Sequence, residues 1–247
     1  QGPRPVGKNL EESMEGLNLV TQNDPKNPAA EAYRVIRTGI QFAQAGKELQ
    51  TIALTSCTPN EGKSTTIANL AVVLTQAGKS VLLIDCDMRN PTVHKNFNLS
   101  NKIGLSSCIS MGTALADAVQ ATGIEGLDAL TAGVIPPNPS ELLGSERMKN
   151  ILQRAKEEYD YVLIDTPPVL PVTDALVLGR LVDGLIMVIN SGEVKVEMAR
   201  DVKNQLVNAG ANILGVVLNK VRSEHHGYGY GYYYYYGHDG EKHKKSN

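Results

Sequence analysis

Five short apolar runs, each rich in β-branched residues, alternate along this chain with longer segments of helical periodicity. They are TIALTS (51–56), SVLLID (80–85), YVLIDT (161–166), GLIMVIN (184–190) and ILGVVLN (213–219). Strands that are apolar on both faces must be covered on both faces, and helices between them return the chain across the sheet. The alternation therefore predicts an α/β fold with a mostly parallel sheet flanked by helices.

Composition divides the chain into an arm, one domain and a tail. Residues 1–27 are polar, lack periodicity and end in helix breakers, so we expect an extended N-terminal arm. Residues 28–221 hold the predicted strands and helices, and the polar middle of this domain carries no predicted strand. Residues 222–247 are dominated by Gly, Tyr, His and Lys, which predicts a flexible tail without a core. The predicted helices cover roughly 29–45, 62–77, 147–158, a segment after 173, and 196–208.

Charge and cysteine content exclude several classes of function. The net charge of −2 gives no reason to expect nucleic acid as a partner, and the three cysteines form no C-x-x-C pair. No apolar run reaches the roughly 20 residues of a membrane span, and no signal peptide is visible. We therefore expect a cytoplasmic setting. The opening QGPRP is compatible with a cloning remnant, or with the cut end of a longer protein whose membrane part lies upstream.

The segment SCTPNEGKS (56–64) directly follows a predicted strand and opens a predicted helix. A loop in this position can direct successive backbone N–H groups at a phosphate, and the positive end of the helix dipole adds to the attraction. Lys63 would reach the β and γ phosphates, and the Ser64 hydroxyl would coordinate Mg²⁺. The strict phosphate-loop pattern fails at its first position, where Cys57 stands, and the alternative is a surface turn that contains a lysine. The predicted nucleotide contacts are Pro59, Asn60, Glu61, Gly62, Lys63, Ser64 and Thr65.

Carboxylates end two of the predicted strands. VLLIDCDMRNP (81–91) carries Asp85 and Asp87, and YVLIDTPP (161–168) carries Asp165. Ligands of open α/β sheets bind beyond the carboxyl ends of the strands, so these acids would meet a metal-bound phosphate there. An acid at a strand end is common on its own, but two of them together with a phosphate loop favour nucleotide chemistry.

Three sequence boxes, the phosphate-loop segment and the two acidic strand ends, occur here together with the helix EAYRVIR (31–37) and a terminal tyrosine cluster. This combination resembles the bacterial tyrosine kinases (BY-kinases) of capsule and exopolysaccharide systems. The resemblance covers about residues 20 to 236. It implies a P-loop fold of the MinD/ParA type, and a protein tyrosine kinase that uses ATP and Mg²⁺. The family usually has Gly where this chain has Asn60, and Asn tolerates a left-handed backbone better than most residues.

The MinD/ParA ATPases resemble the chain in the same three boxes and provide the alternative function, an ATPase switch without kinase activity. Their phosphate loop carries an additional lysine at the position of Thr58, and they lack a tyrosine tail, which favours the kinase. A third alternative makes the tail an aromatic binding module.

The resemblance also implies roles for the site residues. Lys63 and the loop amides would stabilise the transferring phosphoryl group. Ser64, Asp85 and Asp165 would act on Mg²⁺ directly or through its waters, and Asp87 would accept the tyrosine proton or serve as another metal contact. Asn219 would hydrogen-bond the adenine edge. A guanine-specific N-K-x-D signature is incomplete after Asn219, which favours adenine.

Glu31, Arg34 and Arg37 recur every three residues of EAYRVIR and share one side of a helix. Composition alone favours a solvated face. The resemblance instead makes E-x-x-R-x-x-R an oligomerisation motif of ring-forming kinases whose neighbours phosphorylate each other. Many family members are activated by a transmembrane protein of the polysaccharide co-polymerase type and opposed by a tyrosine phosphatase. We therefore expect recruitment to the inner membrane face through such an activator or through a fused upstream region.

Seven of the ten tyrosines lie between Gly227 and Gly237. As phosphate acceptors they would add about −10 to −14 charges when fully modified, and that charge could dissolve a ring. The alternative is a low-complexity end with no role in catalysis. The predicted acceptors are Tyr228, Tyr230, Tyr232, Tyr233, Tyr234, Tyr235 and Tyr236.

Overall fold

The computed structural model describes residues 17–44, 46 and 48–221. They form one seven-stranded sheet in the order β3-β4-β2-β5-β1-β6-β7. All neighbouring pairs are parallel except β3 and β4. The strands are β1 (Thr51–Ser56), β2 (Val81–Asp85), β3 (Gln120–Ala121), β4 (Leu127–Leu130), β5 (Tyr161–Asp165), β6 (Gly184–Asn190) and β7 (Ile213–Asn219).

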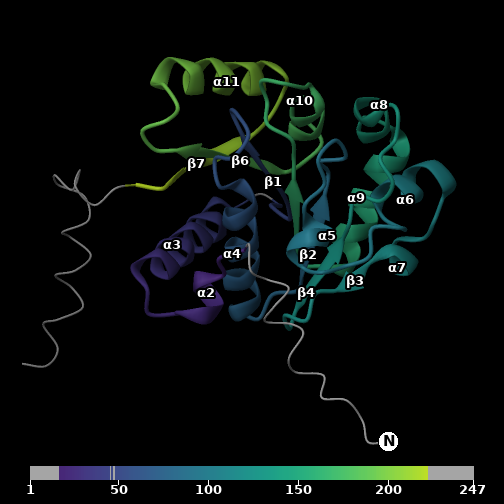
Figure 1. Cartoon of the computed structure of the whole chain (residues 1–247), viewed down its shortest axis with the longest axis horizontal. Coiled ribbons are helices and arrows are strands. Elements are labelled where there is room, and N and C mark those ends of the chain that lie inside the picture. The colour runs from purple at the N-terminus through teal and green to yellow at the C-terminus, as the bar shows by residue number, and fades with distance from the viewer. Residues whose placement is uncertain (1–16, 45, 47, 222–247) are drawn as a thin grey trace, which may run out of the picture.

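Helices cover both faces of this sheet (Figure 1). Those that precede β3 are α2 (Val20–Asn23), α3 (Pro28–Ala43), α4 (Lys63–Gln76), α5 (Val93–Asn96), α6 (Leu105–Met111) and α7 (Leu115–Ala118). Those that follow β4 are α8 (Pro139–Leu143), α9 (Glu146–Glu158), α10 (Asp174–Gly179) and α11 (Val196–Asn208). Among the described helices, none is long and apolar enough to cross a membrane.

Successive residues of the central strands enter two separate cores. In β2, Leu83 packs in the core that includes α4, whereas Leu82 and Ile84 pack in the core that includes α9 and α10. Because side chains alternate across a strand, residues of a strand that is covered on both faces must all be apolar. The predicted parallel α/β fold is thus confirmed, and each of the five predicted apolar runs holds a strand.

Two expectations about the chain's organisation are wrong. Residues 17–27 do not form an extended arm, because they contain α2, and Leu19 is buried beside α4. The Thr21 hydroxyl donates to Asn69 Oδ1 at 2.8 Å, which ties this segment to α4. The polar middle also contains two strands, of which β3 has two residues and β4 has four, too short for periodicity to reveal.

Candidate active site

The phosphate loop (57–62) connects the end of β1 to the start of α4. Gly62 precedes α4 with φ 82°, and Asn60 has φ 65°, so both lie in the left-handed region. Asn60 thus takes the left-handed backbone that asparagine tolerates better than most residues. The loop and the first turn of α4 therefore present backbone N–H groups at the carboxyl edge of the sheet.

Glu61 holds this loop from inside the protein. Its Oε1 accepts from the Thr58 N–H at 2.7 Å and from the Thr58 hydroxyl at 3.0 Å, and its Oε2 accepts from the Asn190 N–H at 2.9 Å. The residue is 2% exposed. The expected nucleotide contact of Glu61 therefore does not involve its side chain, which ties the loop to the end of β6.

Asn219, at the end of β7, also contacts the phosphate loop. Its Nδ2 donates to the Glu61 carbonyl at 3.1 Å, and a Cβ on Gly62 would lie 1.7 Å from this nitrogen. Asn219 thus holds the phosphate loop through its amide nitrogen, and its predicted hydrogen bond to adenine stays a prediction. Only glycine fits at position 62 while this contact is kept.

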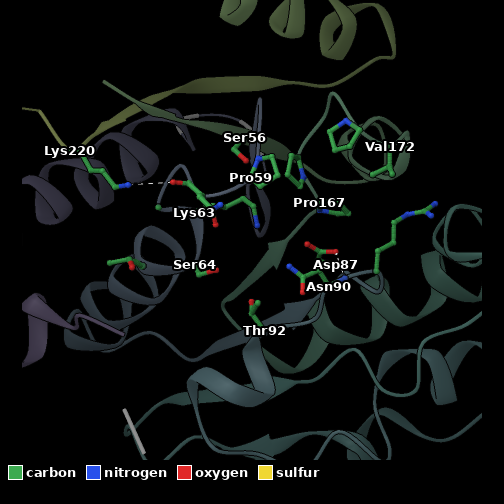
Figure 2. A pocket seen from close by; sticks show the side chains of 16 residues that line it. Ser56, Pro59, Lys63, Ser64, Asp87, Asn90, Thr92, Pro167, Val172 and Lys220 are labelled. Carbon is green, nitrogen blue, oxygen red and sulfur yellow. Dashed lines mark hydrogen bonds between the residues drawn. The ribbon is translucent and has the colours of Figure 1, made fainter. Parts of the chain in front are cut away.

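A cavity of about 560 Å³ opens over the loop (Figure 2). Seven of the predicted residues line it, whereas Glu61, Asp85, Asp165 and Asn219 do not. The lining residues are Ser56, Pro59, Asn60, Gly62, Lys63, Ser64, Thr65, Asp87, Arg89, Asn90, Thr92, Pro167, Pro168, Pro171, Val172 and Lys220.

The three predicted carboxylates have different surroundings. Asp85 is 0% exposed, and its Oδ2 accepts from two consecutive N–H groups, of Thr92 and Val93, both at 3.0 Å. Burial and the charge of Asp165 raise the pKa of Asp85 to about 7, although these hydrogen bonds act to lower it. Asp85 thus shapes the turn after β2 from beneath the cavity and does not line it.

Asp165 lies opposite Asp85 in the register of β2 and β5, and its Oδ1 forms an ion pair with Lys63 Nζ. Asp87 lines the cavity, and its Oδ1 accepts from the Asn90 N–H at 3.0 Å. Burial raises the pKa of Asp87, against the opposing effects of that N–H and of Lys63. Among the three, Asp87 is the carboxylate that a bound substrate can reach.

Mg²⁺ prefers hard oxygen ligands and usually takes one or two protein groups together with phosphates and waters. Within the residues that the structure describes, no cluster of three or more acidic, His or Cys side chains could hold a metal alone. Ser64 in the cavity and Asp165 beneath it fit a Mg²⁺ whose other ligands come from the nucleotide. Asp85 fits less well, because both of its oxygens accept from backbone amides.

Sequence reasoning missed Arg89 and Lys220, which also line the cavity. Arg89 donates from Nε and Nη2 to the two oxygens of Asp174 at 3.0 and 3.1 Å, and Asp174 is fully buried. Arg89 lies inside the box VLLIDCDMRNP, two residues after Asp87, which was an available signal. Lys220 Nζ lies 3.4 Å from the Asn60 carbonyl oxygen. A dashed line at Lys220 marks this contact in Figure 2.

The residues of the helix motif make contacts within the chain. Arg34 pairs with Glu31 at 2.7 Å and donates to the Pro25 carbonyl at 2.7 Å. Arg37 donates to the Val73 carbonyl of α4 at 2.6 Å. The role of these three residues between subunits stays a prediction. The seven predicted acceptor tyrosines, Tyr228 to Tyr236, lie outside the described residues.

Comparison with known proteins identifies the family. Residues 49–209 match a family described as an AAA domain. The chain is 47% identical over 212 residues to the tyrosine-protein kinase YwqD of Bacillus subtilis strain 168, covering 85% of this chain and 90% of YwqD. It is similar to the solved kinase domain of Escherichia coli tyrosine kinase ETK, with a TM-score of 0.79, 38% identity, and coverage of 86% and 85% of the two chains.

The septum site-determining protein MinD of Pyrococcus horikoshii, solved with Mg-ADP, is similar at a TM-score of 0.58 and 25% identity, over 69% of this chain and 70% of MinD. This more distant similarity agrees with the predicted P-loop fold. The nearly full-length match to YwqD and the match to the ETK kinase domain go further. The chain belongs to the bacterial tyrosine kinase (BY-kinase) family.

Proposed function

We propose that this chain transfers the γ-phosphoryl group of ATP to tyrosine hydroxyls, with Mg²⁺ as cofactor. The observation that carries the proposal is the cavity in which a phosphate loop, Lys63 and Ser64 lie together with the reachable carboxylate Asp87. Phosphoryl transfer needs positioning and charge stabilisation more than covalent chemistry, and these groups supply both. Membership of the tyrosine kinase family supports tyrosine as the acceptor.

The roles of the residues follow from their contacts. Lys63 would leave Asp165 for the more highly charged phosphates and stabilise the charge that develops on the transferring group. Ser64, with Asp165 beneath it, would hold Mg²⁺, which neutralises phosphate charge when bound. Asp87 would accept the phenol proton, because it is the one of the three carboxylates that lines the cavity, and burial raises its pKa above the ordinary value. Asp85 would order the turn that carries Asp87, and Asn219 would hold the loop.

We further propose that the seven tail tyrosines are acceptors and that a neighbouring subunit modifies them. Val221, the last residue that the structure describes, directly follows Lys220, which lines the cavity. Assembly into a ring through Glu31, Arg34 and Arg37 would bring tails to neighbouring sites. Accumulated phosphate charge would oppose this assembly and so regulate polysaccharide synthesis and export.

The partners that fit this function are a transmembrane activator of the polysaccharide co-polymerase type and a tyrosine phosphatase that restores the unmodified tail. Recruitment to the inner face of the membrane would then come from the activator or from a fused upstream region. The alternative of a MinD-like ATPase switch receives support from the shared fold. That switch would have to work without the additional phosphate-loop lysine of the MinD/ParA ATPases, because Thr58 stands at its position.

A mixing experiment tests both the chemistry and its geometry. A Lys63→Met chain can only accept phosphate, and a chain with all seven tail tyrosines changed to Phe can only donate it. After phosphatase treatment, each is incubated with ATP and Mg²⁺, alone and together, with and without the cytoplasmic segment of a candidate activator. The intact mass of the Lys63→Met chain should rise in steps of one phosphate when the two chains are mixed, and neither chain should gain mass when it is incubated by itself. ATP hydrolysis without any mass increase would favour the ATPase switch.

A further inference from the structure

The cavity has two chemically different ends (Figure 2). Lys63 and Ser64 lie at the end formed by the phosphate loop and α4. The other end holds a wall of apolar side chains from the segment after β5, with Asp87, Asn90 and the rest of the polar turn after β2 beside it. The wall consists of Pro167, Pro168, Pro171 and Val172.

Hydrogen bonds hold this wall in its middle and just beyond its far end. The Val169 N–H donates to the Ser56 carbonyl at 2.9 Å, and the Leu170 N–H donates to the Cys57 carbonyl at 3.2 Å, which ties the segment to β1 and the phosphate loop. At the far end, Asp174 is held by Arg89 through two hydrogen bonds. Three prolines further restrict the backbone and offer no N–H group to a ligand. The result is a stiff surface suited to a flat apolar group.

The direction of phosphoryl transfer indicates which ligand meets this wall. A nucleotide whose phosphates lie at the N-terminus of α4, beside Lys63 and Ser64, would direct its γ-phosphoryl group toward the carboxylates and its nucleoside to the opposite side. The attacking and leaving oxygens lie roughly in line, so the acceptor oxygen approaches from the side opposite ADP. That side is the one with Asp87, Pro167 and Val172.

We propose that Pro167, Pro168, Pro171 and Val172 form the acceptor subsite and pack against the phenol ring of tyrosine, with its hydroxyl at Asp87. In the step, the phenol oxygen forms a bond to the γ-phosphorus, the bond from that phosphorus to the ADP oxygen breaks, and Asp87 receives the phenol proton. The products are phosphotyrosine and ADP. The inference rests on the proposed kinase function and adds the residues that select an aromatic acceptor over serine.

The kinetic test uses the full chain with its seven tail tyrosines changed to Ala, so that an added peptide is the acceptor. The peptide spans residues 227–238 with one tyrosine retained and the others changed to Ala. Val172→Ser should raise the KM for peptide about tenfold, as expected for lost apolar groups in a pocket, and leave the KM for ATP within about twofold. Val207→Ser is the matched control, since Val207 is 49% exposed on α11 and does not line the cavity. An unchanged peptide KM, or a parallel rise in the KM for ATP, would overturn the assignment.

A binding measurement decides the same question without catalysis. The peptide is made with Phe or Ala in place of its tyrosine, and its affinity for the chain loaded with Mg-ADP is measured by fluorescence anisotropy. The Phe peptide should bind roughly tenfold more tightly than the Ala peptide, and Val172→Ser should remove this preference. Equal affinities would refute the subsite. Because this readout needs no phosphoryl transfer, a chain that binds Phe selectively but never phosphorylates would refute the kinase function alone.

Discussion

Glu61→Gln is the sharpest test of how the phosphate loop is held. The carboxylate of Glu61 receives two N–H donors on different oxygens, from Thr58 and from Asn190, in a site where the residue is 2% exposed. Glutamine keeps one acceptor oxygen and places an NH₂ group against the second donor. One buried N–H group is then unsatisfied, which costs about 1 to 3 kcal/mol of the free energy of unfolding.

The same substitution should weaken ATP binding about tenfold, because a loop released from β6 must be ordered when the nucleotide binds, and 1.4 kcal/mol corresponds to a factor of ten. Urea unfolding and a fluorescent ATP analogue with Mg²⁺ measure the two effects. Glu125→Gln removes a charge at an exposed residue and should change neither quantity. The loss should persist at 0.5 M salt, since the contact is buried. If Glu61→Gln matches wild type in both assays, the carboxylate does not hold the loop.

Three further substitutions test separate parts of the structure. Gly62→Ala should weaken ATP binding more than Gly192→Ala, because both glycines have left-handed φ values (82° and 85°) but only the Cβ at position 62 meets another atom, at 1.7 Å. For Asp183, burial acts to raise the pKa, but hydrogen bonds from two backbone N–H groups and a nearby lysine lower it overall. Asp183→Asn should therefore lose about 1 to 3 kcal/mol of unfolding free energy at pH 7. The deficit relative to wild type should shrink as the pH falls below about 4, where a carboxylate with a depressed pKa begins to lose its contribution. Arg89→Met should lose on the order of 3 kcal/mol in urea unfolding, because Asp174 is left buried without its cation. A second change, Asp174→Asn, should restore part of that stability, and no recovery would argue against the ion pair as the cause.

The sequence was sufficient for the central sheet because each inner strand is apolar on both faces. Runs such as VLLID and YVLID leave no alternative to burial on two sides, and the helices between them dictate parallel pairing. The segments it did not predict depend on contacts distant in sequence. The four residues of β4 pair with β2, and the two-residue β3 pairs in turn with β4 at the edge of the sheet. α2 is stabilised against α4, through contacts that a local pattern does not reveal.

Within the site, residue type and position at a strand end predicted which side chains lie near the cavity, but not the direction in which each points. Glu61 in the loop and Lys63 at the start of α4 are two residues apart, yet the side chain of Glu61 is turned into the protein and that of Lys63 lines the cavity. The position of Asn219 at the end of β7 did not reveal that its amide donates to the Glu61 carbonyl, past a Gly62 that has no Cβ to obstruct it. These outcomes are decided by partners such as the Asn190 amide, more than 120 positions away in the sequence.

The three carboxylates show how one sequence device can serve three purposes. Asp85, Asp87 and Asp165 all end or follow an apolar strand, so the sequence treats them alike. Both oxygens of Asp85 accept hydrogen bonds from backbone N–H groups. Asp165 forms an ion pair with Lys63, which a bound phosphate would compete for. Among the three, Asp87 alone lines the cavity, where its Oδ1 accepts from the Asn90 N–H. Proton transfer requires a carboxylate oxygen that a substrate can reach, so geometry favours Asp87 as the base even though burial raises the pKa of Asp85 to about 7.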